Sequence, residues 1–143
     1  MNIEDETILA RTIYGEARSE DDEGRRAIAH VVLNRVSRCL SIGHGPDHTI
    51  AAACLRPFQF SCWNWNDPNR DKLMAVENGD PVFRACRSAV RAAELEIDFT
   101  HGARHYLTTA RRAQGWPLSW GIFAQEREPC YVHGGHLFYN DLN

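Results

Sequence analysis

A glutamate placed among apolar side chains is the residue of this sequence whose position most suggests chemistry. Leu9, Ile13 and Glu16 are spaced at i, i+4 and i+7, which places all three on one face of a helix. A carboxyl group held against apolar surroundings stays protonated more readily, because desolvation disfavours its charged form. Such an acid can protonate a glycosidic oxygen, as the catalytic glutamate of lysozyme does. Gly15, the preceding residue, would let a substrate approach the backbone closely.

The same pattern also has a purely structural interpretation, in which Glu16 lies at a helix edge or pairs with a nearby arginine. Glu20 is the nearest rival acid, since it lies four residues further along. The segment "SEDDEG" is expected to end the helix before Glu20, which makes Glu20 a solvated capping residue. Glycosidases that use two carboxylates hold them ~5–5.5 Å or ~6.5–9.5 Å apart. A single well-placed glutamate favours one group that acts first as acid and then as base.

The elements that must position Glu16 are predicted to be mainly helical. The periodicity predicts helices over residues 7–18, 23–38 and 50–55 and a long one from Pro81, with the second as the buried central helix. Residues 58–69, "FQFSCWNWNDPN", are predicted to form a surface loop. Residues 103–108 and 135–140 are predicted strands that can pair, with residues 114–120 and 126–135 as connecting loops.

Length and composition restrict the classes of protein that the chain can be. A chain of 143 residues with 43% apolar residues is typical of one globular domain. Its formal net charge of −3 argues against a general nucleic-acid binder. Its 5 cysteines form no CxxC pair, which favours reduced thiols over disulfides or a zinc site. No apolar run suits a signal peptide or stable membrane insertion, so we expect cytoplasmic synthesis.

Several blocks of the sequence carry a family resemblance. They are "ARTIYGEAR…GRRAIAHVVLNRV", "TIAAACLRPFQFSCW", "ACRSAVRAA", "GARHYL" and "GGHLFYN". In this order they resemble the cell wall hydrolase family of the spore cortex-lytic enzymes and related phage and prophage lysins. The resemblance implies an α+β, mainly helical, lysozyme-like domain over residues 1–143, similar to goose-type lysozyme and lytic transglycosylases, with a small C-terminal β-hairpin. It also implies cleavage of peptidoglycan glycan strands between N-acetylmuramic acid and N-acetylglucosamine.

The resemblance identifies Glu16 as the catalytic acid of the motif Tyr-x-Glu-Ala-Arg, with no cofactor. Ser19 departs from the glycine that usually follows this motif, and the segments 41–48 and 119–132 look longer than usual. The reaction is either a lytic transglycosylase reaction or hydrolysis by a muramidase. A wall substrate would require release of the enzyme from the cytoplasm, for which a holin or another release partner is a hypothesis.

Polar and aromatic side chains elsewhere are candidates for substrate binding. Gln59 and Ser61 can hydrogen-bond N-acetyl or hydroxyl groups, and Tyr106 and Tyr139 can orient Glu16 or the sugar. Indole rings can stack on sugar faces, and the candidates are Trp63, Trp65 and Trp116. Each of these aromatic residues could instead cover the edge of the core.

Two alternatives to glycan cleavage remain open. Cys62, with His105 or His136 as base, could form a cysteine endopeptidase acting on peptidoglycan stem peptides. The chain could also be a non-catalytic glycan-binding module. Zinc is not expected, because the histidine pairs in "HGARH" and "HGGH" lack a third ligand at a known spacing.

Overall fold

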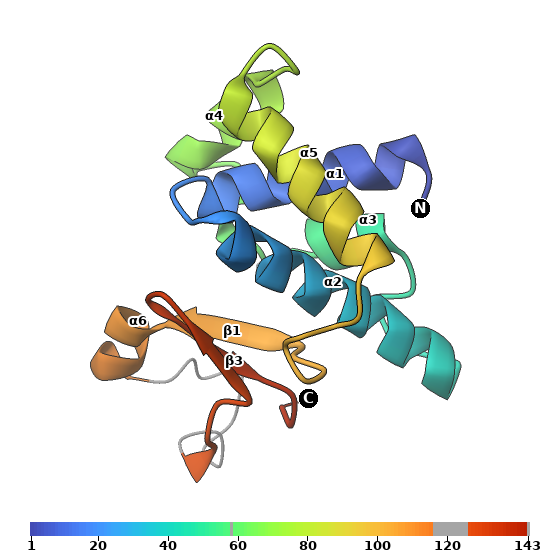
Figure 1. Cartoon of the computed structure of the whole chain (residues 1–143), viewed down its shortest axis with the longest axis vertical. Helices are drawn as coiled ribbons and strands as arrows, with labels where there is room; N and C mark the ends of the chain where they lie inside the picture. The colour runs from blue at the N-terminus through green and yellow to red at the C-terminus, as the bar shows by residue number, and fades with distance from the viewer. Residues whose placement is uncertain (58, 116–125, 143) are drawn as a thin grey trace.

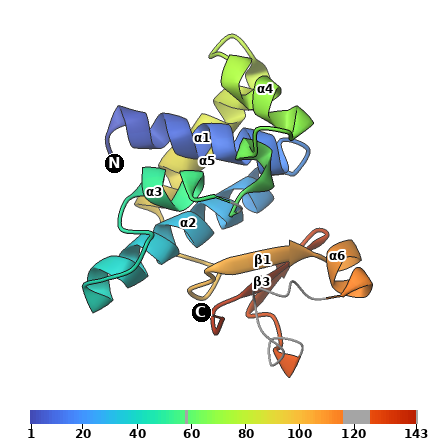
Figure 2. The same ribbon diagram turned by 180° about the vertical axis from the view of Figure 1, so that it is seen from behind.

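A computed structural model describes residues 1–57, 59–115 and 126–142 of the chain (Figure 1). Its helices are α1 (Ile3–Ala17), α2 (Asp22–Ile42), α3 (Ile50–Leu55), the 3₁₀ helix η1 (Ser61–Trp63), α4 (Pro68–Ala75), α5 (Pro81–Leu95) and α6 (Thr109–Gln114). Its strands are β1 (His105–Thr108), β2 (Tyr131–His133) and β3 (His136–Tyr139). The longer helices pack together on one side, and the small sheet lies beside α2 (Figures 1 and 2).

Capping side chains place the ends of the first two helices. α1 begins four residues earlier than predicted, because the Asn2 side chain accepts a hydrogen bond from the Asp5 N–H and acidic residues fill the first turn. α2 begins after Asp21, whose side chain accepts from the Gly24 N–H. It continues to Ile42, four residues past the predicted end, and stops at Gly43, which has a left-handed φ of 77°.

The main core lies between α1, α2 and α5. Leu9 and Ile13 of α1 are fully buried, as is Ile28 of α2. Phe83 and Val90 supply the buried face of α5. The prediction that the second helix is the buried central one is confirmed, since α2 contacts α1, α3, α5 and β1. The last turn of α1, which carries Glu16, therefore follows directly from a helix packed in the core.

The sheet is antiparallel, with the strand order β1-β3-β2. The predicted pairing of residues 103–108 with residues 135–140 is confirmed. β2 falls in a segment predicted as a loop, because a three-residue strand is too short to show an alternating pattern. Tyr106 and Phe138 are register partners and pack against the main core. Leu107, Leu137 and Tyr139 occupy the opposite face, where they form a second core cluster with Leu142.

Residues 59–69 do not form the surface loop that the composition of residues 58–69 predicts. Phe60 and Cys62 are buried in the main core, and η1 covers one side of α1. α4 follows, beginning at Pro68 after the N-cap residue Asp67. This is the same Asp-Pro signal that correctly predicts the start of α5. The burial of η1 brings its backbone beside the end of α1.

Candidate active site

Glu16 lies in the last turn of α1, where three elements meet. Its side chain is half-buried. Its Oε2 accepts a hydrogen bond from the Tyr106 hydroxyl of β1 at 3.4 Å, and its Oε1 accepts one from the Cys62 backbone N–H of η1 at 3.5 Å. Both contacts are long for hydrogen bonds. They direct the carboxyl group from two sides, while its partial exposure leaves it accessible to a reacting group.

Gly15 is required by packing within the protein rather than by the approach of a substrate. A Cβ atom at this position would lie 2.7 Å from Cys62 Cβ and 2.7 Å from Leu73 Cδ2. The absence of a side chain therefore allows η1 to pack directly against α1. That close approach is what places the Cys62 N–H beside the Glu16 carboxylate.

The Tyr106 hydroxyl is a hydrogen-bond donor toward Glu16. Burial raises the pKa of Tyr106 well above its ordinary value, and the neighbouring Glu16 carboxylate raises it further. The phenol consequently remains protonated at neutral pH. A protonated phenol beside an ionised carboxylate stabilises the ionised form and orients it.

Trp63 is anchored to α1 by a hydrogen bond from its indole ring. Its Nε1 donates to the hydroxyl of the buried Thr12 at 2.9 Å. Trp63 and Trp65 line one hollow of about 420 Å³ together with Asn64 and Asn66. Trp65 is 85% exposed. Amphipathic aromatic rings next to amide groups offer both the apolar surface and the hydrogen-bonding groups that a polar ring-shaped ligand requires.

The other predicted substrate-binding residues have different environments. Gln59 is exposed, and its Oε1 accepts a hydrogen bond from Arg35 Nη1 at 3.0 Å. Ser61 is exposed at the start of η1. Tyr139 is fully buried on the sheet face opposite Tyr106, so the structure does not bring it to Glu16. Trp116 lies outside the described residues.

Glu20 is not the solvated cap that the sequence predicts. Its Oε1 lies 3.1 Å from Nδ1 of His136 in β3, and its side chain is only 25% exposed. The His136 ring packs edge-on against Tyr106, with 5.6 Å between ring centroids. Glu16, Tyr106, His136 and Glu20 therefore form a continuous row. The sequence signals for this contact are the acidic run after α1 and the histidines of the β2–β3 hairpin. The contact itself is visible only in the folded structure, where these distant segments lie together.

Cys62 has the wrong environment for a nucleophile. Its thiol is buried and contacts the Thr12 carbonyl oxygen at 3.9 Å. Burial raises the pKa of Cys62, and the nearby Glu16 carboxylate raises it further. The thiolate that a cysteine endopeptidase needs is thus disfavoured. All five cysteines are free thiols in the structure.

The histidines of the β2–β3 hairpin contact carboxylates of the helical part. His133 lies 2.7 Å from Asp21 and 2.6 Å from Glu23 through its two ring nitrogens.

Within residues 1–57, 59–115 and 126–142, no three histidine, cysteine or acidic side chains are grouped to hold a metal ion. In the same part of the chain, no helix combines the length and the apolar character needed to cross a membrane.

The chain belongs to the cell wall hydrolase family, because residues 19–139 match the model of that family. The expected membership and the expected class of enzyme, a cell wall hydrolase, are thereby confirmed. The matched segment begins three residues after Glu16, so the match does not include the proposed acid.

A relative found by sequence comparison agrees with this family assignment. The chain is 35% identical over 86 residues to a spore cortex-lytic enzyme of Oceanobacillus iheyensis, an alignment that covers 54% of this chain and 29% of the relative. The chain thus matches less than a third of that protein's length.

Two solved structures have a similar fold. The catalytic domain of the Bacillus cereus SleB protein superposes with a TM-score of 0.71 at 22% identity, covering 96% of this chain and 91% of that domain. The catalytic domain of the germination-specific lytic transglycosylase SleB from Bacillus anthracis gives 0.69 at 22% identity, with 96% and 95% covered. The predicted mainly helical, lysozyme-like fold is confirmed, with three strands where a hairpin is expected.

Proposed function

We propose that this chain cleaves peptidoglycan glycan strands between N-acetylmuramic acid and N-acetylglucosamine, with Glu16 as the general acid and base. The observation that carries the proposal is the convergence of α1, η1 and β1 on the Glu16 carboxyl group. Two donors orient the group, and its partial exposure leaves it open to a substrate. The names of the relatives, a spore cortex-lytic enzyme and a lytic transglycosylase, support the same class of substrate.

The reaction that best suits one available carboxylate is a lytic transglycosylase reaction. Glu16 donates its proton to the glycosidic oxygen as the bond from that oxygen to the muramyl anomeric carbon breaks. The muramyl 6-hydroxyl oxygen then forms a bond to the anomeric carbon, and its proton passes to the Glu16 carboxylate. The products are a 1,6-anhydromuramyl end and a new N-acetylglucosamine end, and no water is consumed.

The environment of Glu20 supports this reaction over a two-carboxylate mechanism. Retaining glycosidases place a second carboxylate ~5–5.5 Å from the acid as a nucleophile. Glu20, the candidate nearest in sequence, is engaged by His136, with Tyr106 between that pair and Glu16. Tyr106 and the Cys62 N–H would stabilise the ionised Glu16 that forms after the first proton transfer.

The tryptophan hollow supports a glycan as the ligand. η1 carries Cys62, which contacts Glu16, and Trp63, which lines the hollow. A sugar ring stacked on Trp63 or Trp65 would therefore belong to the same strand whose bond is presented to Glu16. Hydrogen bonds from Asn64 and Asn66 to hydroxyl or N-acetyl groups would fix its orientation.

Mass spectrometry of digested sacculi tests the proposal. The wild-type chain should release fragments with anhydromuramyl ends, and Glu16→Gln should release none. Glu20→Gln should give the wild-type products. Reducing muramyl ends would replace the transglycosylase reaction with hydrolysis. Cut stem peptides, or no products from a folded wild-type chain, would overturn the proposal in favour of an endopeptidase or a binding module.

A further inference from the structure

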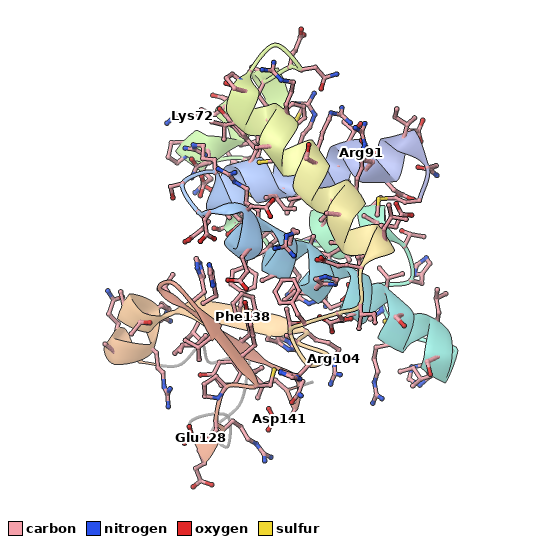
Figure 3. All side chains as sticks on the ribbon, in the orientation of Figure 1. Lys72, Arg91, Arg104, Glu128, Phe138 and Asp141 are labelled. Atoms are coloured by element: carbon pink, nitrogen blue, oxygen red, sulfur yellow. The ribbon has the colours of Figure 1, made fainter. Side chains whose placement is uncertain are left out.

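A pocket lined by arginines lies between the second half of α2 and the start of β1. It has a volume of about 340 Å³, and its charged walls are Arg35, Arg38, Arg56, Arg104 and Asp47. Four cationic side chains thus face a single carboxylate, although the chain as a whole has a net charge of −3. Figure 3 shows Arg104 at the end of the sheet near the C-terminal segment. Such a concentration of guanidinium groups attracts an anionic ligand.

Two residues that line this pocket each carry a buried polar atom without a hydrogen-bond partner among the described residues. Asp47 is 5% exposed, and its Oδ2 accepts from Arg56 Nη2 at 3.0 Å while its Oδ1 accepts from none. Nε of Arg56 is likewise buried and unbonded within the described chain. A buried polar atom without a partner is costly. One atom is an acceptor and the other a donor, so a ligand that satisfies both must carry groups of both kinds.

Arg35 forms the inner wall of the pocket. It is 8% exposed, and its guanidinium donates to the Arg104 carbonyl oxygen at 2.6 Å and to Gln59 at 3.0 Å. Burial lowers the pKa of Arg35, and the positive charge of Arg56 lowers it further, while Asp47 raises it. The positive charge of the buried Arg35 guanidinium is therefore only partly balanced by Asp47, and an anion bound in the pocket would balance the remainder.

The pocket is connected to the proposed active site by packing through the core and by one shared wall. The Arg35 guanidinium lies 5.4 Å from the centroid of Phe60, whose ring lies 6.5 Å from that of Tyr106, the residue that contacts Glu16. Arg56 lines both this pocket and the tryptophan hollow. Phe60 is buried, so a ligand cannot follow the first connection, but a ligand that continues from a sugar bound in the tryptophan hollow would meet Arg56 at the edge of the pocket.

We propose that the arginine pocket binds the peptide stem of the muramyl residue through the carboxylates of the stem, an inference that rests on the proposed function. Guanidinium groups bind carboxylates in a bidentate manner. The N–H groups of a peptide would satisfy Asp47 Oδ1, whereas an inorganic phosphate would bring further negative charge to that oxygen. At ~3.3–3.6 Å per extended residue, a stem of three residues spans roughly 10 Å.

Cleavage of matched substrates tests this inference. Glycan strands with native stems are compared with the same strands after amidation of the stem carboxylates and after removal of the stems by an amidase. The wild-type chain should prefer native stems over amidated ones by about tenfold in kcat/KM, the effect of one hydrogen bond between charged groups. Arg38→Gln, at an exposed position of the pocket wall, should lose most of that preference.

Arg84→Gln is the matched control, since Arg84 is an exposed arginine of α5 bonded to the carbonyl oxygens of Asn78 and Gly79. It should keep the wild-type preference. Equal cleavage of native and amidated strands by the wild type would overturn the pocket assignment and leave glycan cleavage standing. If no strand is cut, calorimetry with free acidic stem peptide still decides the pocket. Binding that Arg38→Gln weakens supports the assignment, whereas no binding, or equal competition by inorganic phosphate, overturns it.

Discussion

The Tyr106 hydroxyl lies 3.4 Å from the Glu16 carboxylate, although 90 positions separate the two residues in the chain. The contact joins the end of α1 to the first strand of the sheet, so the orientation of the acid depends on how the sheet packs against the helices. It also makes the phenol a positioning group whose loss can be measured separately from the loss of the acid.

We expect Tyr106→Phe to lower kcat on sacculi by about tenfold, because a hydrogen bond to an ionised carboxylate is lost. KM should change little, because Tyr106 contacts the acid rather than a predicted sugar-binding residue. Tyr139→Phe is the control, because Tyr139 is buried on the opposite face of the sheet. Equal losses in both variants would indicate a structural role for Tyr106.

Glu16→Gln should reduce the rate of turbidity loss by at least ~10²–10⁴-fold, which is the contribution of a positioned acid–base group. The fold should remain, with an unchanged or higher thermal midpoint, because a half-buried carboxylate with long hydrogen bonds adds little stability. If Glu16→Gln lyses sacculi like the wild type while Glu20→Gln is inactive, the acid has been assigned to the wrong residue.

Glu20→Gln tests the contact with the sheet. We expect lysis to persist and the free energy of unfolding to fall by about 0.5–1 kcal/mol, the contribution of one partly exposed hydrogen-bonded contact. His136→Gln should produce a similar decrease, and the double variant should lose less than the sum of the two. Urea denaturation of the four proteins measures this coupling, and strict additivity would show that the contact contributes nothing.

Gly15→Ala should destabilise the chain by roughly 1–3 kcal/mol, because the added methyl group would overlap Cys62 and the Leu73 side chain. Activity should fall as well, since η1 must move away from Glu16. Gly79→Ala is the control, because a Cβ atom there meets nothing within 4 Å. Equal stability of the two variants in urea would contradict the close packing of η1 on α1.

Buried thiols predict a loss of stability in alkali. Burial raises the pKa of Cys54 to about 12 and that of Cys86 to about 11, from a reference value of 9.0. The folded state therefore holds these protons more tightly than the unfolded state. The stabilisation of the folded state that these two thiols contribute is complete below pH 9 and decreases as the pH rises toward 11. Urea unfolding at pH 8 and at pH 10.5 measures the decrease, which Cys86→Ala should reduce.

Local sequence patterns determined most of the helical framework. The Leu9–Ile13–Glu16 spacing predicts the helix that carries the acid, and the Asp80–Pro81 pair predicts the start of α5. These features depend on neighbouring residues alone, since periodicity and capping act within a few turns. The family motif likewise identifies Glu16 among the acidic residues, because the residues of the motif are contiguous in the chain.

Only the tertiary structure decided which distant side chains surround that acid. Tyr106 and Tyr139 were both candidates in the sequence, and the pleat of the sheet directs Tyr106 toward Glu16 and buries Tyr139 on the opposite face. Glu20 reads as a solvated cap until β3 brings His136 within 3.1 Å of it. Both outcomes depend on strand register and on packing between segments far apart in the chain, and no local pattern encodes either of them.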